Sequence, residues 1–221
     1  MKGLNVLIID DHPLIVNAYT QALENVGSNM ALVIDCLGSI DEFKEFLKSN
    51  STINNIDLIF LDIRLPVGSS KDFLSGEDIG IYIRNLNRDT KIIISTSLTD
   101  NFRVQGILKS IDPEGFLIKN DLTPKELILA IENVISGSPY YSNLVLTLLR
   151  KQFNNDKYLD ELDRRLLYEL SLGTKMKDLP KILPLSIAGI EKRKRNLKIL
   201  FNVENDGDRG LILVAKEKGF L

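Results

Sequence analysis

Short apolar runs and longer amphipathic stretches alternate five times in the first part of the chain, and this alternation constrains the fold most. The short runs cover residues 5–9, 31–34, 58–61, 92–95 and 116–118, and most are unbroken Val, Ile, Leu or Phe. Such runs are typical of strands buried on both faces of a parallel sheet. The stretches 13–26, 40–49, 77–87, 101–110 and 124–136 have helical periodicity. Five strand–helix units in a row predict a doubly wound, flavodoxin-like α/β domain over residues 1–137.

Local signals at the helix ends agree with this reading. Ser39 with Glu42, and Thr123 with Glu126, have the spacing of capping boxes, and Pro124 would occupy the first helical position. Gly137 ends the last helix of the series. Residues 138–158 are then expected to form a linker that contains a helix over 142–152 and a polar breaker after it.

Residues 159–221 contain no convincing strand and predict an all-α second domain. Four short helices are expected at about 160–172, 175–182, 186–201 and 208–218, with Gly173, Pro184 and Gly207 between them. Residues 160–221 contain more basic than acidic residues, whereas residues 1–159 contain more acidic ones. A basic second domain indicates nucleic acid as a partner, although the excess is small.

Composition excludes several classes of protein. No apolar run approaches the ~18–20 residues that span a bilayer, and the N-terminus lacks a signal-peptide pattern, so we expect a soluble cytoplasmic protein with no membrane partner. The single Cys36 and single His12 exclude an internal disulfide and a metal site built from Cys or several His residues. Carboxylates and hydroxyls must therefore provide most of the chemistry.

Three acidic residues directly follow two of the expected strands. Asp10 and Asp11 come after the first strand, and Asp62 comes after the third. Ligands of open α/β sheets bind beyond the carboxyl ends of the strands, where the strand order reverses. With the order 2-1-3-4-5, the first and third strands are neighbours and the three acids converge. Carboxylates this close are tolerated around a hard divalent cation, and Mg²⁺ is the natural candidate.

A hydroxyl and an ammonium group are expected at the same sheet edge. Thr96 ends the fourth strand and Lys119 ends the fifth, so both can contact a phosphoryl group. Ser95 and Ser97 are alternatives for the hydroxyl. Taken alone, each acid suits a helix cap or a loop, and Lys119 a solvated surface. Together with Mg²⁺, the set suits formation of an aspartyl phosphate.

The ordered set Asp10-Asp11, Asp62, Thr96 and Lys119 resembles the receiver domain of bacterial response regulators, and Leu61–Pro66 is similar to the phosphoacceptor segment of that family. The resemblance implies that Asp62 accepts a phosphoryl group from a sensor histidine kinase. It also implies that Asp11, Asp62 and the backbone carbonyl of Arg64 bind Mg²⁺, with Asp10 acting through water. Thr96 and Lys119 would then contact the phosphate.

One loop and one residue near this set differ from the family pattern, and His12 beside it is expected to have a structural role. The loop after Pro66, residues 67–75, is several residues longer than is usual, and Phe116 at the switch aromatic position lacks a hydroxyl. His12, followed by Pro13, is expected to start the first helix rather than to be a ligand.

The strongest nucleic-acid signal is the basic helix expected over 186–201. Ser186 suits its N-cap, while Ile190, Leu197 and Phe201 can share one inward face. In a helix-turn-helix arrangement, such a helix lies in the major groove and its basic side chains neutralise phosphates. The candidate DNA contacts are Ser186, Glu191, Lys192, Arg193, Lys194, Arg195 and Lys198.

Residues 158–221 resemble the four-helix DNA-binding domain of NarL/LuxR-type regulators. The match rests on Asp163, Leu167, Leu170 and Gly173, then on Leu185-Ser186, Ile190, Leu197, Leu200 and Val203. It is looser than the receiver match. Gly189 stands where Thr is common, Glu191 puts an acid where many members have a base, and Pro180 is expected to shorten the scaffold helix.

These features predict a two-domain response regulator and transcription factor, not an enzyme. Phosphorylation of Asp62 would shift a conformational equilibrium and so switch homodimer formation and promoter DNA binding. One rival is a receiver whose output domain binds protein. Another is a Mg²⁺-dependent phosphohydrolase that works through an aspartyl phosphate.

Overall fold

The computed structural model of the chain describes residues 3–27, 31–49, 53, 55–66, 72–150 and 159–221. Part of the long loop after Pro66 (67–71) and the end of the expected linker (151–158) lie outside the described residues. The chain divides into two compact units. The first comprises Met1–Ser97 and Ile107–Lys151, and the second comprises Leu98–Gly106 and Gln152–Leu221.

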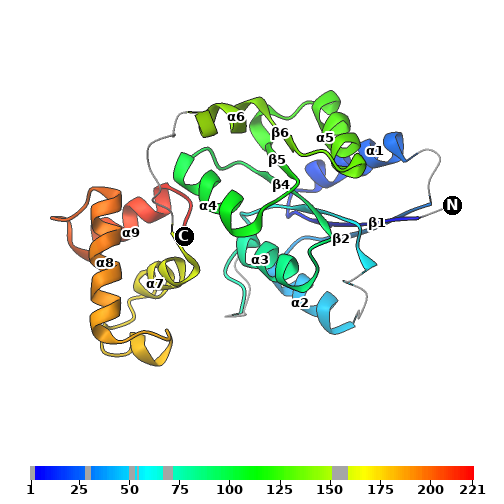
Figure 1. The fold of residues 1–221 in the computed structure, drawn as a ribbon. Helices are drawn as coiled ribbons and strands as arrows, with labels where there is room; N and C mark the ends of the chain where they lie inside the picture. Colours follow the sequence, from blue (N-terminus) through cyan, green and yellow to red (C-terminus); the bar gives the residue numbers. More distant parts are fainter. Residues whose placement is uncertain (1–2, 28–30, 50–52, 54, 67–71, 151–158) are drawn as a thin grey trace. The chain divides into compact units, whose positions relative to one another are not determined.

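A parallel sheet forms the centre of the first unit (Figure 1). Its strand order is β2-β1-β3-β4-β5-β6, which confirms the expected reversal next to the first strand. The strands are β1 (Leu4–Ile9), β2 (Leu32–Leu37), β3 (Leu58–Leu61), β4 (Lys91–Thr96), β5 (Gly115–Ile118) and β6 (Tyr140–Tyr141). β3 and β5 are buried along their whole length, as their continuous apolar sequences predict.

The sixth strand lies within residues 138–158, which the sequence predicts to be a linker. β6 has two residues and continues the parallel ladder beyond β5. Tyr140 N–H donates to Glu114 O at 2.9 Å, and Ser142 N–H donates to Phe116 O at 3.0 Å. A strand this short has no periodicity to detect, and its backbone hydrogen bonds define it.

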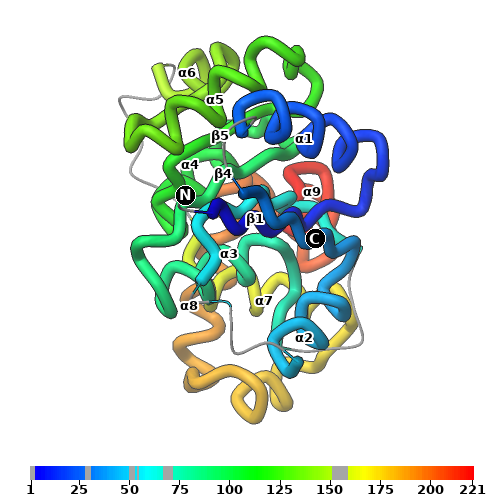
Figure 2. The backbone as a smooth tube through the Cα atoms, turned by 90° about the vertical axis from the view of Figure 1, so that its right-hand side faces the viewer, coloured from blue at the N-terminus to red at the C-terminus, as the bar shows by residue number. Residues whose placement is uncertain are grey.

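Helices cover both faces of the sheet. α1 and α5 pack against each other on one face, around a core that includes Tyr19, Phe60 and Ile131, and Figure 2 shows them side by side. α2 and α3 lie on the opposite face of the sheet (Figure 1). On that face the rings of Phe43, Phe73 and Tyr82 meet edge to face. The helices are α1 (Pro13–Val26), α2 (Ile40–Ser49), α3 (Gly76–Leu86), α4 (Asn101–Ile111), α5 (Pro124–Ser136) and α6 (Asn143–Arg150).

The second unit contains α7 (Glu161–Ser171), α8 (Ile187–Phe201) and α9 (Gly207–Glu217) around an apolar core. Leu167, Ile190 and Leu211 bring one fully buried side chain from each helix into that core. Asp160 and Asp163 form a capping box at the start of α7, and Ser186 Oγ caps α8 by accepting from Gly189 N–H at 3.2 Å.

The prediction of a helix over residues 175–182 is wrong. Residues 175–182 form turns and a short 3₁₀ helix, Leu179–Lys181, instead of an α-helix. Pro180 explains this, because proline lacks the N–H that an α-helix interior needs and its ring clashes with the preceding turn. Leu179 and Leu183 still lie in the core, and their spacing of four residues is the spacing expected of an amphipathic helix.

Among the described residues, none of the helices combines the length and the apolar character that a membrane crossing requires. Cys36, the only cysteine, is exposed on β2.

Candidate functional site

The three acids predicted to converge are brought together at the carboxyl ends of β1 and β3. Ile9 pairs with Leu61 across these strands, so Asp10 and Asp62 are the next residues on neighbouring strands. Asp62 N–H donates to Ile9 O at 2.9 Å, which continues the ladder to the point where the side chains meet. Asp10 and Asp62 are buried, with exposed fractions of 3% and 2%, whereas Asp11 is exposed.

Lys119 joins this cluster at the same edge of the sheet, from β5, which lies two strands beyond β3. It directly follows β5, and its Nζ lies 2.6 Å from Asp62 Oδ2 and 2.7 Å from Asp10 Oδ2. Only 8% of its side chain is exposed. An ammonium group between two buried carboxylates offsets part of the repulsion that burial would otherwise strengthen.

The protonation of Asp62 reflects opposing influences. Burial raises the pKa of its carboxyl above the ordinary value, and the neighbouring charge of Asp10 adds to the rise. The hydrogen bond and charge of Lys119 lower this pKa in part, as does Arg64 N–H, which donates to Asp62 Oδ1 at 2.9 Å. A raised pKa makes the ionised carboxylate more basic, which suits a nucleophile.

The residues at the ends of β4 and β5 differ from one another in burial and in hydrogen bonding. Thr96 and Phe116 are completely buried, and Ser97 is exposed. Ser95 accepts a 2.6 Å hydrogen bond from the hydroxyl of Tyr19, a residue of α1. The buried Ser95 is therefore committed to the α1 side of the sheet.

His12 lies at the acidic cluster, although the sequence predicted only that it starts a helix. It does occupy the N-cap of α1, but its side chain makes no capping hydrogen bond. Its Nδ1 lies 2.8 Å from Asp11 Oδ1 and 3.1 Å from Asp10 Oδ1. The one sequence signal for this placement was its position directly after Asp10-Asp11.

The acidic cluster fits a divalent cation. Asp10, Asp11, His12 and Asp62 each offer a ligand atom, and these atoms lie within 4.8 Å of one another. Asp10 Oδ2 is buried and has no hydrogen-bond partner among the described residues, although it forms an ion pair with Lys119. Three carboxylates at one site are the oxygen-rich donor set that Mg²⁺ prefers.

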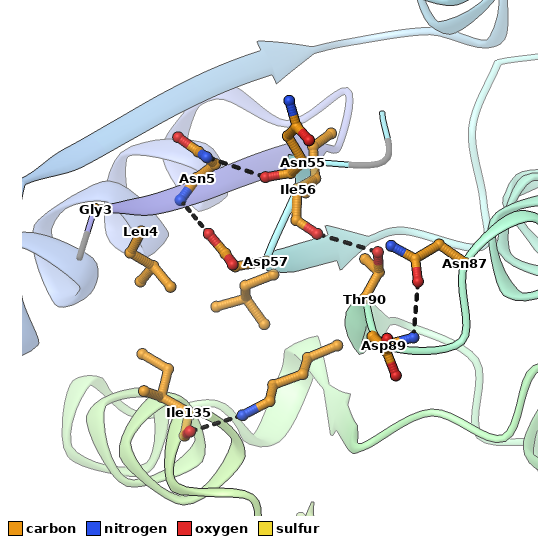
Figure 3. Close-up of a pocket in the computed structure, with 12 residues that line it drawn as sticks. Gly3, Leu4, Asn5, Asn55, Ile56, Asp57, Asn87, Asp89, Thr90 and Ile135 are labelled. Atoms are coloured by element: carbon orange, nitrogen blue, oxygen red, sulfur yellow. Dashed lines mark hydrogen bonds between the residues drawn. The ribbon is translucent and has the colours of Figure 1, made fainter. Parts of the chain in front are cut away.

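A separate hollow of about 720 Å³ lies at the opposite edge of the sheet, near the amino ends of β1, β3 and β4 (Figure 3). Several of its polar groups have partners within the chain. Asn5 N–H donates to Asp57 Oδ2 at 2.9 Å, Thr90 Oγ1 to Ile56 O at 3.1 Å, and Lys91 Nζ to Ile135 O at 2.7 Å. This hollow is on the edge that lacks the acidic cluster, and its hydrogen bonds join structural elements to one another.

The candidate DNA contacts lie on or next to α8, but their surroundings differ. Ser186, Glu191, Lys192 and Arg195 are exposed. Arg193 Nη1 instead lies 2.7 Å from Asp160 Oδ2 and 2.8 Å from Asp163 Oδ1 at the start of α7.

Lys194 and Lys198 are paired with α9. Lys194 Nζ lies 3.0 Å from Asp208 Oδ2, and Lys198 Nζ lies 3.0 Å from Asp208 Oδ1. Burial alone would raise the pKa of Asp208, but the hydrogen bonds and charges of the two lysines outweigh it and hold this pKa below its ordinary value. In this structure, therefore, the side chains of Arg193, Lys194 and Lys198 hold helices together.

Comparisons with known proteins match much of the first unit to a known domain family and most of the chain to two regulatory proteins. A sequence model described as the response regulator receiver domain matches residues 6–132. The nitrate/nitrite response regulator protein homolog of Haemophilus influenzae is 28% identical over 207 residues, 91% of this chain and 92% of that protein. The transcriptional regulatory protein RcsB of Escherichia coli K12 is 25% identical over 214 residues, 93% of this chain and 92% of that protein.

A solved structure with similar folding is RcsB from Salmonella enterica serovar Typhimurium, bound to the promoter P1flhDC in the presence of the phosphomimetic beryllofluoride. The TM-score is 0.62 at 22% identity, and the match covers 96% of this chain and 98% of that one. At this identity the likeness concerns the fold.

Proposed function

The chain belongs to the response regulators, with a receiver domain matched over residues 6–132, and from this premise we propose that Asp62 is its phosphoacceptor. The observation that supports this most strongly is the contact of the buried Asp62 with Lys119 at 2.6 Å, beside Asp10 at the carboxyl edge of the sheet. The phosphoryl donor is a sensor histidine kinase, and Mg²⁺ is the metal required.

In the proposed reaction, an oxygen of Asp62 forms a bond to phosphorus. The bond between phosphorus and the donor's histidine nitrogen breaks, and the electron pair leaves with that nitrogen. Bound Mg²⁺ would offset charge on the transferring phosphoryl oxygens. Asp11, Asp62 and the carbonyl of Arg64 would hold the metal, with Asp10 acting through water. Lys119 and Thr96 then contact the phosphate oxygens, and Phe116 is the switch aromatic.

The output is proposed to be promoter DNA binding by residues 159–221, with residues 138–158 as the connection to the receiver domain of residues 1–137. Relatives named for nitrate/nitrite response and for transcriptional regulation span more than 90% of this chain. α8 is capped at Ser186 and exposes Lys192 and Arg195, which suits insertion of its N-terminal half into a major groove. Phosphorylation would favour a homodimer that binds two half-sites.

A second candidate output is protein binding. The specific observation in its favour is that Arg193, Lys194 and Lys198 are already neutralised by Asp160, Asp163 and Asp208. A helix with fewer available cations has a weaker attraction for phosphates. Salt-dependent binding to duplex DNA separates the two outputs, because a protein-binding domain would not show it.

The first experiment measures phosphoryl transfer to the purified chain from a small acyl phosphate, read by intact mass. We expect one added phosphoryl group that requires Mg²⁺ and is absent in Asp62→Ala. Asp35→Ala is the matched control, since Asp35 is an exposed carboxylate of β2 outside the cluster. An adduct that persists in Asp62→Ala would assign the modification elsewhere. No adduct and no beryllofluoride binding would overturn the proposal.

A further inference from the structure

One pair of hydroxyl groups is buried in the core of the first unit. The Tyr19 hydroxyl, from α1, donates to Ser95 Oγ of β4 at 2.6 Å, and both residues are completely buried. The core cluster that contains Tyr19 is otherwise aliphatic and aromatic, with members such as Ile8, Phe60 and Ile93. Burial raises the pKa of Tyr19, so its hydroxyl keeps its proton and remains a donor. The metal site and the phosphate contacts proposed above use neither residue of this pair.

The pair lies in the same row of the sheet as the proposed phosphoacceptor. Leu61 of β3 pairs with Ile94 of β4. The residue after Leu61 is Asp62, and the residue after Ile94 is Ser95. Thr96, which is proposed to contact the phosphate, directly follows Ser95. A hydrogen bond to Ser95 therefore acts on the backbone level with Asp62 and one residue before Thr96.

The side chain of Tyr19 contacts both strands that carry the proposed site. Its ring stacks on Phe60 of β3, with 4.5 Å between the ring centroids and 15° between the planes. Its hydroxyl is bonded to Ser95 of β4. Phe60 is two residues before Asp62. One rigid ring that stacks on the first strand and is hydrogen-bonded to the second restricts sliding of these strand ends past each other.

Stability alone does not explain a buried pair of hydroxyl groups. A hydrogen bond adds little net stability, because both groups give up water, and two apolar groups of the same shape can be equally stable. A hydrogen bond does fix direction, which apolar contacts do not. Side chains alternate along a strand, so holding Ser95 toward α1 also fixes the side of β4 on which the Thr96 side chain lies. The pair is therefore explained best by its effect on position.

We propose that Tyr19 is a positioning residue of the receiver site, which fixes the carboxyl end of β4 through Ser95. The Thr96 hydroxyl is thereby held where it can contact a phosphoryl group on Asp62. In this role Tyr19 contacts neither the metal nor the phosphoryl group. The inference rests on the proposed function, because it needs Asp62 to be the phosphoacceptor and Thr96 to contact the phosphate.

The test compares three variants of the full chain with the wild type. Tyr19→Phe removes only the donor hydroxyl, Ser95→Ala removes only the acceptor, and the double variant replaces the pair by apolar groups. Ser95→Ala should lower the melting temperature, because it leaves a buried hydroxyl without its partner, and the double variant should recover most of this loss. Tyr82→Phe is the matched control, since it removes a hydroxyl from a partly exposed ring on α3.

Binding of beryllofluoride with Mg²⁺, measured by calorimetry, is the first readout. We expect both single variants and the double variant to bind about three- to tenfold more weakly than the wild type, the effect of one lost hydrogen bond. The double variant separates position from stability, because its melting temperature should recover and its affinity should not. Tyr82→Phe should bind as the wild type does.

Nuclear magnetic resonance relaxation of the threonine methyl groups is the second readout, and it needs neither metal nor phosphate. Tyr19→Phe should increase the mobility of the Thr96 methyl group. Thr90, which directly precedes β4 at the other end of the strand, is the internal control and should not change. A role in overall stability would affect both ends of β4 or neither.

Three outcomes would overturn the inference. They are wild-type affinity for beryllofluoride in Tyr19→Phe, an affinity that recovers together with the melting temperature in the double variant, and unchanged mobility of Thr96 in Tyr19→Phe. In each of these cases the wild type still binds the analogue, so the phosphoacceptor role of Asp62 stands. If the wild type neither bound beryllofluoride nor accepted a phosphoryl group, the proposed function would fail and the positioning role would fail with it.

Discussion

At the scale of single residues, the receiver site places two carboxylates where burial opposes their charge. Asp10 and Asp62 are almost completely buried and adjacent, and Lys119 provides the compensating charge for both. Buried ion pairs of this kind often stabilise a protein less than a neutral replacement does, because desolvation opposes the attraction. Such a site is kept for its chemistry, and neutralising one acid should reveal the cost.

The pKa of Asp62 gives this expectation a pH dependence. Burial raises this pKa above the ordinary value of 3.8, so the folded state binds more protons than the unfolded state as the carboxyl titrates. Stability from this group is therefore present at low pH and lost as the pH rises through the raised pKa. We expect Asp62→Asn to melt at a higher temperature than the wild type at pH 7 without metal.

The difference in melting temperature between Asp62→Asn and the wild type should shrink as the pH falls toward the ordinary pKa of the carboxyl. Thermal unfolding of both proteins from pH 3 to pH 7 measures this difference. Asp35→Asn serves as the control for a change at an exposed carboxylate. An equal melting temperature at every pH would contradict the assignment of a raised pKa to Asp62.

Gly76 is the second residue on which the site depends. A Cβ built there would overlap the carbonyl oxygen of Asp62 and lie 3.0 Å from Ile63 Cα, so the backbone would have to move. We expect Gly76→Ala to lower the free energy of unfolding by about 1–3 kcal/mol and to slow phosphoryl transfer, because the backbone of the phosphoacceptor is displaced. Thermal melting and the intact-mass assay measure the two effects.

Gly106 supplies the matched control for Gly76. It lies inside α4, and a Cβ there would meet nothing within 4 Å. Gly106→Ala should stabilise the helix by up to ~1 kcal/mol through its higher helix propensity. If both alanine variants transfer phosphate like the wild type, the contact of Gly76 with Asp62 does not matter for the site.

At the scale of elements, α8 has two kinds of basic residue on different sides. Arg193 bridges Asp160 and Asp163, and so joins α8 to the capping box that begins α7. Arg195 is exposed, and it forms no ion pair with any residue that the structure describes. The two arginines are two positions apart, so they point to different sides of the helix.

Replacing each arginine by glutamine should separate structure from DNA binding. Arg193→Gln should lower the free energy of unfolding of the second unit by about 1 kcal/mol. The effect is this small because solvent weakens an ion pair that is partly exposed. Arg195→Gln should leave the melting temperature unchanged, weaken DNA binding across sequences and reduce the salt slope by about one. Thermal melting and binding to duplex DNA at several salt concentrations measure both.

The opposite pattern would contradict this division of α8. If Arg193→Gln weakened DNA binding as much as Arg195→Gln without lowering the melting temperature, Arg193 would act as a contact and not as a bridge between helices. If neither variant changed DNA binding, the protein-binding output would gain support.

Most elements could be predicted because each carries a local signal. α1, α2 and α5 begin and end where Pro13, the Ser39 box and the Thr123 box with Gly137 predicted. β6 and the residues near Pro180 were not predicted correctly, because a two-residue strand has no periodicity and a 3₁₀ turn can keep helical spacing of apolar residues.

The features of the site also divide into those that the sequence predicts and those that only the structure reveals. The meeting of Asp10 with Asp62 follows from strand order, and strand order follows from the pattern of buried runs. The orientation of His12 and the pairing of Arg193 depend on side-chain rotamers and on how one helix packs against another. Neither has a period or a spacing in the sequence, so only the structure reveals them.

At the scale of the whole molecule, function requires that the state of one unit change the behaviour of the other. The proposed event, one phosphoryl group on Asp62, is local, and the proposed result is association of two chains on DNA. Coupling of this kind is reciprocal in free energy. If beryllofluoride in both receiver sites strengthens dimer formation tenfold, dimer formation must strengthen beryllofluoride binding by the same factor summed over the two sites, about 1.4 kcal/mol in total.

Reciprocity gives the last prediction two independent measurements. Beryllofluoride with Mg²⁺ should raise the dimer fraction of the wild type in analytical ultracentrifugation and leave Asp62→Asn unchanged, since the analogue must bind the Asp62 carboxylate. The apparent affinity for beryllofluoride should then increase with protein concentration, because a more concentrated sample holds more dimer. An affinity that is independent of concentration, together with an unchanged dimer fraction, would mean that the receiver controls its output within a single chain. Phosphorylation would then have to act on the second unit directly, and DNA affinity should respond to it in the monomer.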